Sequence, residues 1–225
     1  MRTHPFLVVN PGSGGGKGLD ELLFAAQARG IETVRLGEPA DPEADVLGVA
    51  GGDGSLGTVA ATAIERDVPF VCIPFGTRNH FARDAGLPID PVAALAAFDG
   101  DERRVDAGRV NGRVFLNNVS LGAYAGLVHG RVLAGLRERT FFVGNNRYVF
   151  HPFRLGARER LDEGVLQLRA ARGLAPWRWE NEVGPRFDLD LGRRRLQVAI
   201  DGEPVALEGP LELESLPGAL RLLTP

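Results

Sequence analysis

The first hundred residues alternate short apolar runs with helix-compatible segments, and this alternation constrains the fold more than any other feature of the chain. The apolar runs cover residues 6–10, 31–36, 46–51 and 68–74. The helix-compatible segments cover residues 17–29, 55–66 and 91–98. Strands separated by helices are typical of β-α units wound around a parallel sheet. Residues 1–100 are therefore predicted to form an α/β domain.

The pattern changes near Arg103, after which strand-like segments dominate. Two of these segments flank Asn111-Gly112, a dipeptide typical of tight β-hairpin turns. Residues 101–211 are predicted to form a β-rich, sandwich-like second domain, in which only residues 123–138 have a helical pattern. The last residues, about 212–225, predict a closing pair of strands that return to the first domain.

Composition and charge exclude several classes of protein. The 225 residues are 44% hydrophobic, which is ample for a core, and 26 basic against 29 acidic residues leave no basic field for nucleic acid. No segment approaches the roughly 20 apolar residues that a membrane helix needs. The single cysteine, Cys72, lies in an apolar run and is expected to be a buried hydrophobe. We expect a soluble, cytoplasmic protein that meets membranes only at their surface.

Three polar, glycine-bearing loops follow predicted strands of the first half, at residues 10–18, 51–57 and 76–83. Open α/β sheets bind ligands at the carboxyl ends of their strands, so the three loops are expected to lie at one binding edge. Glycine lets the backbone approach a ligand closely, and free N–H groups beside a helix N-terminus favour phosphate. The sequence therefore predicts a phosphate-binding site.

Two well-known phosphate motifs fit these loops only in part. The first loop lacks a Walker A pattern, because Pro11 and Gly18 stand where that motif has glycine and a hydroxyl residue. The second loop matches the dinucleotide fingerprint at Gly52, Gly54 and Gly57, but residues 70–77 lack the expected ribose-binding acid. A nicotinamide-binding domain is thus disfavoured, and a plain strand-to-helix turn stays an alternative for the second loop.

Six segments carry a resemblance to a known family: NPGSG (10–14), GGDGS (51–55), GTRNHFARDAGLP (76–88), VDAGRVNGRVFLNNVSLGAYA (105–125), DEGVLQL (162–168) and DGEP (201–204). In this order, the chain resembles the catalytic domain of the diacylglycerol kinase family of lipid kinases, relatives of the sphingosine kinases and NAD kinases. The resemblance implies the fold shared by NAD kinases and diacylglycerol kinases. It also implies Mg²⁺-dependent transfer of the γ-phosphate of ATP to a hydroxyl of diacylglycerol or a related lipid.

The resemblance also implies roles for individual residues. Nucleotide contacts are expected from all three loops: Asn10, Pro11, Gly12, Ser13 and Gly14; Gly51, Gly52, Asp53, Gly54, Ser55, Leu56 and Gly57; Thr77 and Asn79. Two residues receive catalytic roles, Asp53 beside the phosphates through Mg²⁺ or water and Glu203 as the proton acceptor. Asp106 and Glu163 correspond to further acids and are expected metal ligands.

Three of these acids also have a structural interpretation. Asp53 follows a turn and is a candidate helix N-cap. Glu203 lies in a hairpin turn, where a glutamate is usually solvated, and Asp106 is a candidate strand-edge charge. None of the four histidines, His4, His80, His129 and His151, has a paired spacing typical of zinc sites, so no metal site is expected from them.

Two departures from the family keep other functions open. His80 stands where many members have an aspartate near Mg²⁺, and residues 31–46 and 128–142 are short for the family. An NAD kinase-like enzyme with a soluble acceptor is one alternative, although Asn117-Asn118 lacks the glutamate of that branch. A nucleotide-binding pseudo-kinase without turnover is another. The expected partner is a lipid at a membrane surface, and a homo-oligomer is compatible with the sequence.

Overall fold

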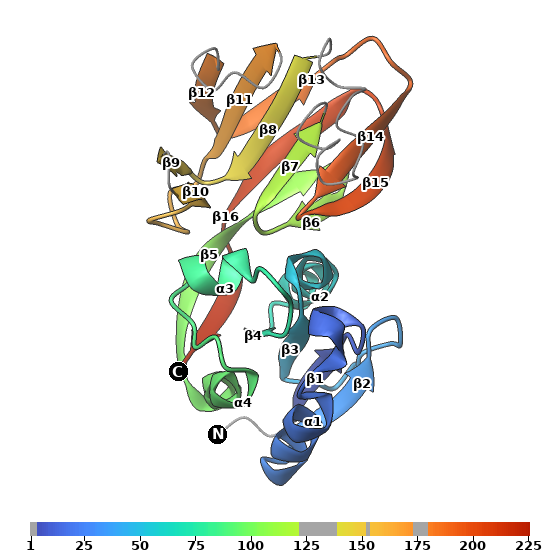
Figure 1. The fold of residues 1–225 in the computed structure, drawn as a ribbon, viewed down its shortest axis with the longest axis vertical. Coiled ribbons are helices and arrows are strands. Elements are labelled where there is room, and N and C mark those ends of the chain that lie inside the picture. Colours follow the sequence, from blue (N-terminus) through green and yellow to red (C-terminus); the bar gives the residue numbers. More distant parts are fainter. Residues whose placement is uncertain (1–3, 122–138, 152–153, 173–179) are drawn as a thin grey trace. The chain divides into compact units, whose positions relative to one another are not determined.

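The computed structural model describes residues 4–121, 139–151, 154–172 and 180–225 (Figure 1). The chain divides into two compact units, Met1–Val105 with Gly218–Pro225, and Asp106–Pro217. The first unit is an α/β domain with a mostly parallel sheet and the second is rich in antiparallel strands, so the predicted fold class is confirmed. The helix expected at residues 123–138 lies outside the described residues.

The first unit is built from β-α repeats followed by short helical turns. Its elements are β1 (Pro5–Val9), η1 (Ser13–Gly16), α1 (Leu19–Ala28), β2 (Glu32–Arg35), β3 (Val46–Gly51), α2 (Asp53–Glu65), β4 (Phe70–Pro74), α3 (His80–Asp84), α4 (Pro91–Ala94), η2 (Leu95–Asp99) and the start of β5 (Asp101–Val110). The helix expected over residues 91–98 is thus split into α4 and η2. The strand order is β2-β1-β3-β4, and these neighbours are parallel.

Burial along the strands explains this order. Strands β3 and β4 are buried throughout, as expected for uninterrupted apolar runs inside a parallel sheet. Strand β2 is short and mostly exposed, and it forms the edge. A core of buried residues joins the sheet to α1, α4 and η2, including Leu7, Leu22, Ile73, Leu95 and Phe98. Burial of these side chains is the main stabilising term for the unit.

The C-terminal segment is one strand, β16 (Leu211–Thr224), so the expected closing pair of strands is wrong. Pro217-Gly218 is typical of a turn, yet the chain stays extended on both sides and Gly218 absorbs the irregularity with a φ of 59°. Beyond this point Leu222 pairs with Phe70 of β4. The guanidinium of Arg221 binds both carboxylate oxygens of Glu102, at 2.8 and 2.9 Å. Residues 218–225 therefore complete the sheet of the first unit.

The second unit consists of packed antiparallel strands. They are β6 (Arg113–Phe115), β7 (Asn118–Leu121), β8 (Arg139–Asn145), β9 (Val149–His151), β10 (Arg154–Ala157), β11 (Leu166–Arg172), β12 (Glu180–Gly184), β13 (Arg186–Leu189), β14 (Arg195–Ile200) and β15 (Glu203–Glu208), with the end of β5 and the start of β16. Six of them form a sheet in the order β12-β11-β8-β7-β14-β15. Its core also contains residues of β5, β6, β13 and β16, such as Val110, Phe115, Phe187 and Leu213, as in a sandwich.

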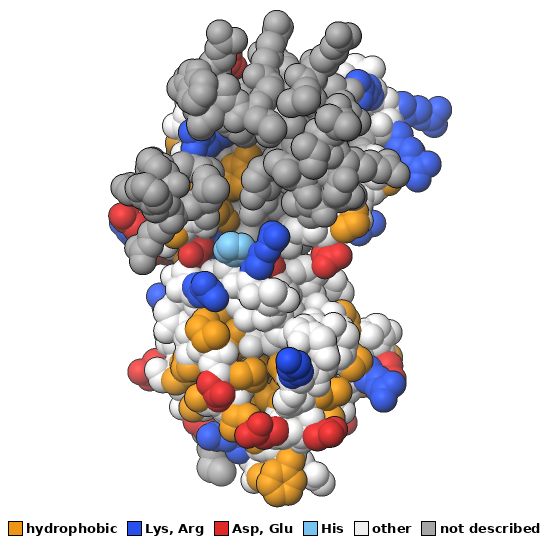
Figure 2. All heavy atoms as spheres, in the orientation of Figure 1, with side chains coloured by type: hydrophobic (Ala, Val, Ile, Leu, Met, Phe, Trp, Pro, Cys, Tyr) orange, Lys and Arg blue, Asp and Glu red, His pale blue; other side chains and the backbone are white. Residues whose placement is uncertain are grey.

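Charged side chains of both signs are scattered over the visible part of the described surface (Figure 2). This mixture agrees with the small net charge of −3. Among the described helices, none has both the length and the apolar composition needed to cross a bilayer.

Candidate active site

Three loops of the first unit leave the carboxyl ends of β1, β3 and β4. These strands are adjacent and parallel, in the order β1-β3-β4. Parallel neighbours end at the same edge of a sheet, so residues 10–14, 51–55 and 75–79 meet there. The structure thus brings together the three loops singled out in the sequence.

A hydrogen bond from the Asn10 side chain joins the first loop to the second. Its side-chain amide donates to the Ser55 hydroxyl at 2.8 Å, and its side-chain oxygen accepts the backbone N–H of Gly12 at 3.1 Å. In return, the Ser13 hydroxyl accepts the backbone N–H of Gly52 at 3.2 Å. Because both ends of the Asn10 amide have loop partners, its side chain fixes the shape of the loops.

Glycine is required where the loops touch. A Cβ on Gly14 would lie 2.8 Å from the carbonyl oxygen of Phe75, and a Cβ on Gly76 would lie closer still to the backbone of Gly52. Gly14 also has a φ of 59°, a left-handed conformation that side chains disfavour. The exposed backbone of Gly14 and Gly15 leaves a ligand free to approach. The cradle therefore consists of bare main chain, which suits phosphate oxygens.

The carboxylate of Asp53 binds the start of α3. Its two oxygens accept the backbone N–H groups of His80 at 3.0 Å and Phe81 at 3.1 Å. The N-cap of its own helix α2 is Gly52, so the capping role considered for Asp53 is directed to the neighbouring helix instead. Each carboxylate oxygen has a further lone pair, and Asp53 is only half-buried. The side chain therefore holds the third loop, and its half-buried position keeps it accessible to solvent.

Asn79 has a structural position in the third loop. It is 7% exposed, its side-chain oxygen accepts the N–H of Gly76 at 2.9 Å, and its side-chain nitrogen donates to the Gly76 carbonyl at 2.8 Å. Because the side-chain oxygen and nitrogen of Asn79 both bind Gly76, this side chain stabilises the turn of the third loop. Thr77, by contrast, is exposed. Its contact with a nucleotide stays a prediction.

The remaining residues of the second loop differ in accessibility. Ser55 is 7% exposed and Leu56 is 2% exposed, so their side chains belong to the interior. Any nucleotide contact from them would come from the backbone. Pro11 and Gly12 are exposed, while Gly54 and Gly57 are half-buried at the start of α2.

Two predicted metal ligands lie near each other in the second unit. Asp106 is 2% exposed, and its carboxylate accepts the backbone N–H of Gly164, next to Glu163, at 2.6 Å. Glu163, however, accepts the backbone N–H of Arg147 at 2.9 Å and pairs with its guanidinium at 2.7 Å. Both Glu163 oxygens thus have a partner, as both Asp53 oxygens do, and a metal-binding role for Asp106 and Glu163 stays a prediction.

Glu203 follows a tight turn between β14 and β15. Asp201 and Gly202 have φ angles of 49° and 89°, as in a type I′ hairpin turn, and Glu203 is exposed. The neighbouring Asp201 was not recognised from the sequence as more than part of the turn. Its carboxylate is buried and accepts three consecutive backbone N–H groups, from Leu116, Asn117 and Asn118, at 2.7 to 2.9 Å.

A buried arginine in the second unit was also missed. Arg158 is 4% exposed, donates to the Leu116 carbonyl and to the Asn117 side chain, both at 2.6 Å, and lies 5.2 Å from the centre of the Tyr148 ring. The asparagine pairs at 117–118 and 145–146 were the available signal, because asparagine-rich turns often surround a buried polar group. Arg158 and Asp201 both act on the segment that contains Asn117.

Burial raises the pKa of the Cys72 thiol far above its usual range, and the negative charge of Asp53 adds to this effect. A thiol held neutral in this way is a poor nucleophile. The interpretation of Cys72 as a buried hydrophobe is confirmed, since its exposed fraction is 1%.

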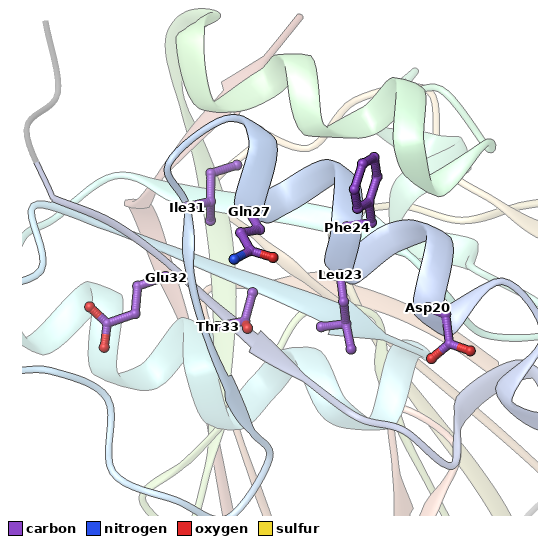
Figure 3. A pocket seen from close by; sticks show the side chains of 7 residues that line it. All are labelled: Asp20, Leu23, Phe24, Gln27, Ile31, Glu32 and Thr33. Carbon is purple, nitrogen blue, oxygen red and sulfur yellow. The ribbon is translucent and has the colours of Figure 1, made fainter.

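A hollow of about 560 Å³ lies elsewhere in the first unit, between α1 and β2 (Figure 3). Its lining residues are Asp20, Leu23, Phe24, Gln27, Ile31, Glu32 and Thr33. None of these residues is basic and two are acidic, so the hollow is unsuited to a nucleotide. The three loops remain the candidate active site.

Comparison with known proteins agrees with this location. The family model of the diacylglycerol kinase catalytic domain matches residues 4–110, which include all three loops. Residues 4–110 are thus similar to the catalytic domain of the diacylglycerol kinases. A Pseudomonas fluorescens protein named "Probable lipid kinase YegS-like" is 37% identical over 102 residues, 44% of this chain and 33% of that protein. A Pseudomonas aeruginosa protein of the same name is 47% identical over 78 residues, 34% of this chain and 26% of that protein.

A Staphylococcus saprophyticus protein named diacylglycerol kinase is 35% identical over 103 residues, 44% of this chain and 34% of that protein. The matches to these curated relatives thus span about a third of their length or less. A crystal structure of a diacylglycerol kinase from Bacillus anthracis has the same fold as this chain. Its TM-score is 0.77 at 20% identity, over 99% of this chain and 97% of the other.

Proposed function

We propose that this protein acts as a lipid kinase, which transfers the γ-phosphate of ATP to a hydroxyl group of diacylglycerol or a related lipid. The observation that carries the proposal is the interlocked cradle of bare glycine backbone at the ends of β1, β3 and β4, with one carboxylate, Asp53, beside it. Phosphoryl transfer depends mainly on positioning and on charge neutralisation, and such a cradle serves both.

The first and second loops would bind the nucleotide through their main chain. Gly12, Gly14 and Gly52 present backbone at the carboxyl edge of the sheet, and the N-terminus of α2 points its partial positive charge toward the same edge. The hydrogen bonds of Asn10 and Ser13 hold these loops in place before a ligand binds. A cradle formed in advance spares the ordering cost on binding.

Asp53 is the residue that fits a magnesium ion in the first unit, since Mg²⁺ prefers carboxylate oxygen and bridging water. When bound, the ion would neutralise charge on the phosphates. Asp106 and Glu163, in the second unit, stay proposed metal ligands, and the Glu163 carboxylate is paired with Arg147. Asp53 also orders α3, so its side chain links the third loop to the metal.

Glu203 is proposed to accept the proton of the lipid hydroxyl. It is exposed at the end of a hairpin whose turn is anchored through Asp201, so its backbone is fixed while its carboxylate stays accessible. A general base must reach the proton that it removes, and a fixed position raises the fraction of productive encounters. The enzyme is proposed to act at a membrane surface, where such lipids reside.

Phosphate transfer from γ-labelled ATP tests the proposal, with Mg²⁺ and a panel of acceptors: diacylglycerol, monoacylglycerol and sphingosine in mixed micelles, and NAD in buffer. Labelled lipid is expected from the wild type. Glu203→Gln should lower the rate by about 10²- to 10⁴-fold, the usual range for a general base. Glu208→Gln, in the same strand β15 and also exposed, is the matched control and should stay active. Labelled NADP would indicate a soluble acceptor, and ATP binding without any product would indicate a binding module.

A further inference from the structure

Three side chains converge at the opposite edge of the first sheet, where the parallel strands begin. His4 precedes β1, Glu32 is the first residue of β2, and Asp41 lies in the loop before β3. The His4 Nε2 atom lies 3.4 Å from Glu32 Oε2 and 3.6 Å from Asp41 Oδ2. One ligand atom from each residue falls within 4.8 Å of the other two. We name these three residues the His4 cluster.

The main chain around the His4 cluster is fixed. The backbone N–H of His4 donates to the Asp45 carboxylate at 3.1 Å, and the N–H of Asp45 donates back to the His4 carbonyl at 3.1 Å. The second oxygen of Asp41 accepts the N–H of Glu43 at 2.8 Å. The Asp41 oxygen that does not accept from Glu43, Oδ2, is the one that lies 3.6 Å from His4 Nε2.

The electrostatics of the His4 cluster favour a cation. It contains two carboxylates and one imidazole, and within the described part of the chain no lysine or arginine pairs with the carboxylates of Glu32 or Asp41. Arg66 is close, but its guanidinium donates to the carbonyl oxygens of Asp41, Pro42 and Ala44. It therefore fixes the loop without neutralising the acids.

The spacing fits coordination by a metal ion. Ligands about 2.0–2.1 Å from a tetrahedral ion lie about 3.3–3.4 Å from one another, close to the 3.4 and 3.6 Å measured from His4 Nε2. The side chains of His4 and Asp41 are about one-third exposed, at 34% and 32%, so water can complete the coordination shell. In Figure 3 the Glu32 carboxylate points away from Phe24.

We propose that His4, Glu32 and Asp41 bind one divalent transition-metal ion, of the Zn²⁺ or Co²⁺ type. Imidazole nitrogen selects such ions over Mg²⁺ and Ca²⁺, which prefer all-oxygen shells. The bound ion joins the starts of β1 and β2 to the loop before β3, on the edge away from the phosphate loops. Its role is structural, and the proposal is independent of the lipid kinase activity. It also reverses the expectation drawn from histidine spacing, because the ligands come from three separate segments.

Cobalt binding by the metal-stripped protein tests this proposal. Co²⁺ is added to the full chain, and its visible absorption bands report an imidazole-containing shell of low coordination number. Asp53→Asn serves as the background, so that the active-site carboxylate does not contribute. One equivalent should bind, with a micromolar dissociation constant, and a matching Zn²⁺ titration should raise the midpoint of thermal unfolding by about 5 °C at saturation.

The variants His4→Gln, Glu32→Gln and Asp41→Asn should each weaken Co²⁺ binding by at least about 30-fold, while Glu43→Gln, an exposed neighbour, should bind normally. Circular dichroism without metal shows whether each variant is folded, and Glu32→Gln changes only an exposed side chain. Absence of stoichiometric Co²⁺ binding to the folded wild type would overturn the proposal. Co²⁺ binding that survives in all three variants would overturn it as well.

Discussion

A Cβ atom built on Gly76 would lie 2.4 Å from the Cα atom of Gly52. At this point the second and third loops of the candidate site therefore touch through their main chains. The same Cβ would also lie 3.0 Å from the Asn79 side-chain oxygen that orders the third loop. The Cα and N atoms of Gly52 are backbone and cannot rotate aside, so the distance between the loops depends on the absence of one carbon atom.

The Gly76→Ala variant is expected to push the loops apart. The added methyl group should lower the free energy of unfolding by about 1–3 kcal/mol, the usual cost of overpacking, and should weaken ATP binding by at least about tenfold, which corresponds to ~1.4 kcal/mol. Isothermal titration calorimetry with ATP checks the affinity. Gly184→Ala is the matched control, since its nearest neighbour would lie at an ordinary 3.6 Å. Wild-type ATP affinity in Gly76→Ala would contradict the role given to this contact.

The Asp53→Asn variant should affect stability as well as transfer. Asparagine has one acceptor oxygen where Asp53 uses two for the N–H groups of His80 and Phe81. Loss of a charged hydrogen bond is expected to lower the free energy of unfolding by about 1.5–3 kcal/mol. Urea denaturation measures this change. The control Asp99→Asn, whose carboxylate is 84% exposed, should stay within about 0.5 kcal/mol of the wild type. An Asp53→Asn protein of unchanged stability would show that the bonds to α3 contribute little.

Substitution of Asp201 should lower the stability of the protein, whereas substitution of Glu203 should lower its kinase activity. Asp201→Ala removes the acceptor of three buried N–H groups and is expected to lower the free energy of unfolding by about 2–4 kcal/mol. Glu203→Gln changes an exposed side chain, and its stability should shift by less than about 0.5 kcal/mol. Urea denaturation of both variants, beside the kinase assay, separates the structural role from the proposed chemical one. Equal losses of stability would argue against this division.

The thiol of Cys72 predicts a pH dependence. Burial raises its pKa in the folded protein above the ordinary value of 9.0, so the folded state keeps a proton that the unfolded state releases. The contribution of Cys72 to the free energy of unfolding is fully present below pH 9. Above pH 9 it falls by up to about 1.4 kcal/mol per pH unit. Denaturation between pH 8 and pH 10 should show this slope, and Cys72→Ala should lack the contribution. Rapid labelling of the native thiol at pH 8 would contradict its burial.

The parallel sheet and its loops could be predicted because their signals are local. A strand buried on both faces is a continuous apolar run, as in residues 46–51 and 68–74, and a glycine-rich stretch after such a run marks a loop at the carboxyl edge. The Pro217-Gly218 dipeptide is also a local signal, for a turn, and it led to the wrong prediction of two strands at the C-terminus. There, pairing with β13 on one side and β4 on the other keeps the strand extended.

The partners of the polar side chains could not be predicted in this way. Asp201 binds a segment more than eighty residues earlier in the chain, and Asp53 binds the start of a helix 27 residues later. Arginine is usually solvated, so nothing in the neighbourhood of Arg158 marks it as buried until the turns at Asn117 and Asn145 are placed around it. Such contacts are set by tertiary structure, which spacing along the chain does not encode.

Strand β16 has a consequence for the order in which the protein can fold during synthesis. The sheet of the first unit places this strand between β4 and β5, yet the part of it that belongs to the first unit, from Gly218 on, follows the entire second unit in the chain. During synthesis, the edge of the first sheet at β4 therefore stays unpaired while residues 106–217 are translated. An open edge is prone to pairing with other chains. A stalled or truncated product that ends before Leu220 is thus the form of this protein most exposed to aggregation and to chaperone capture.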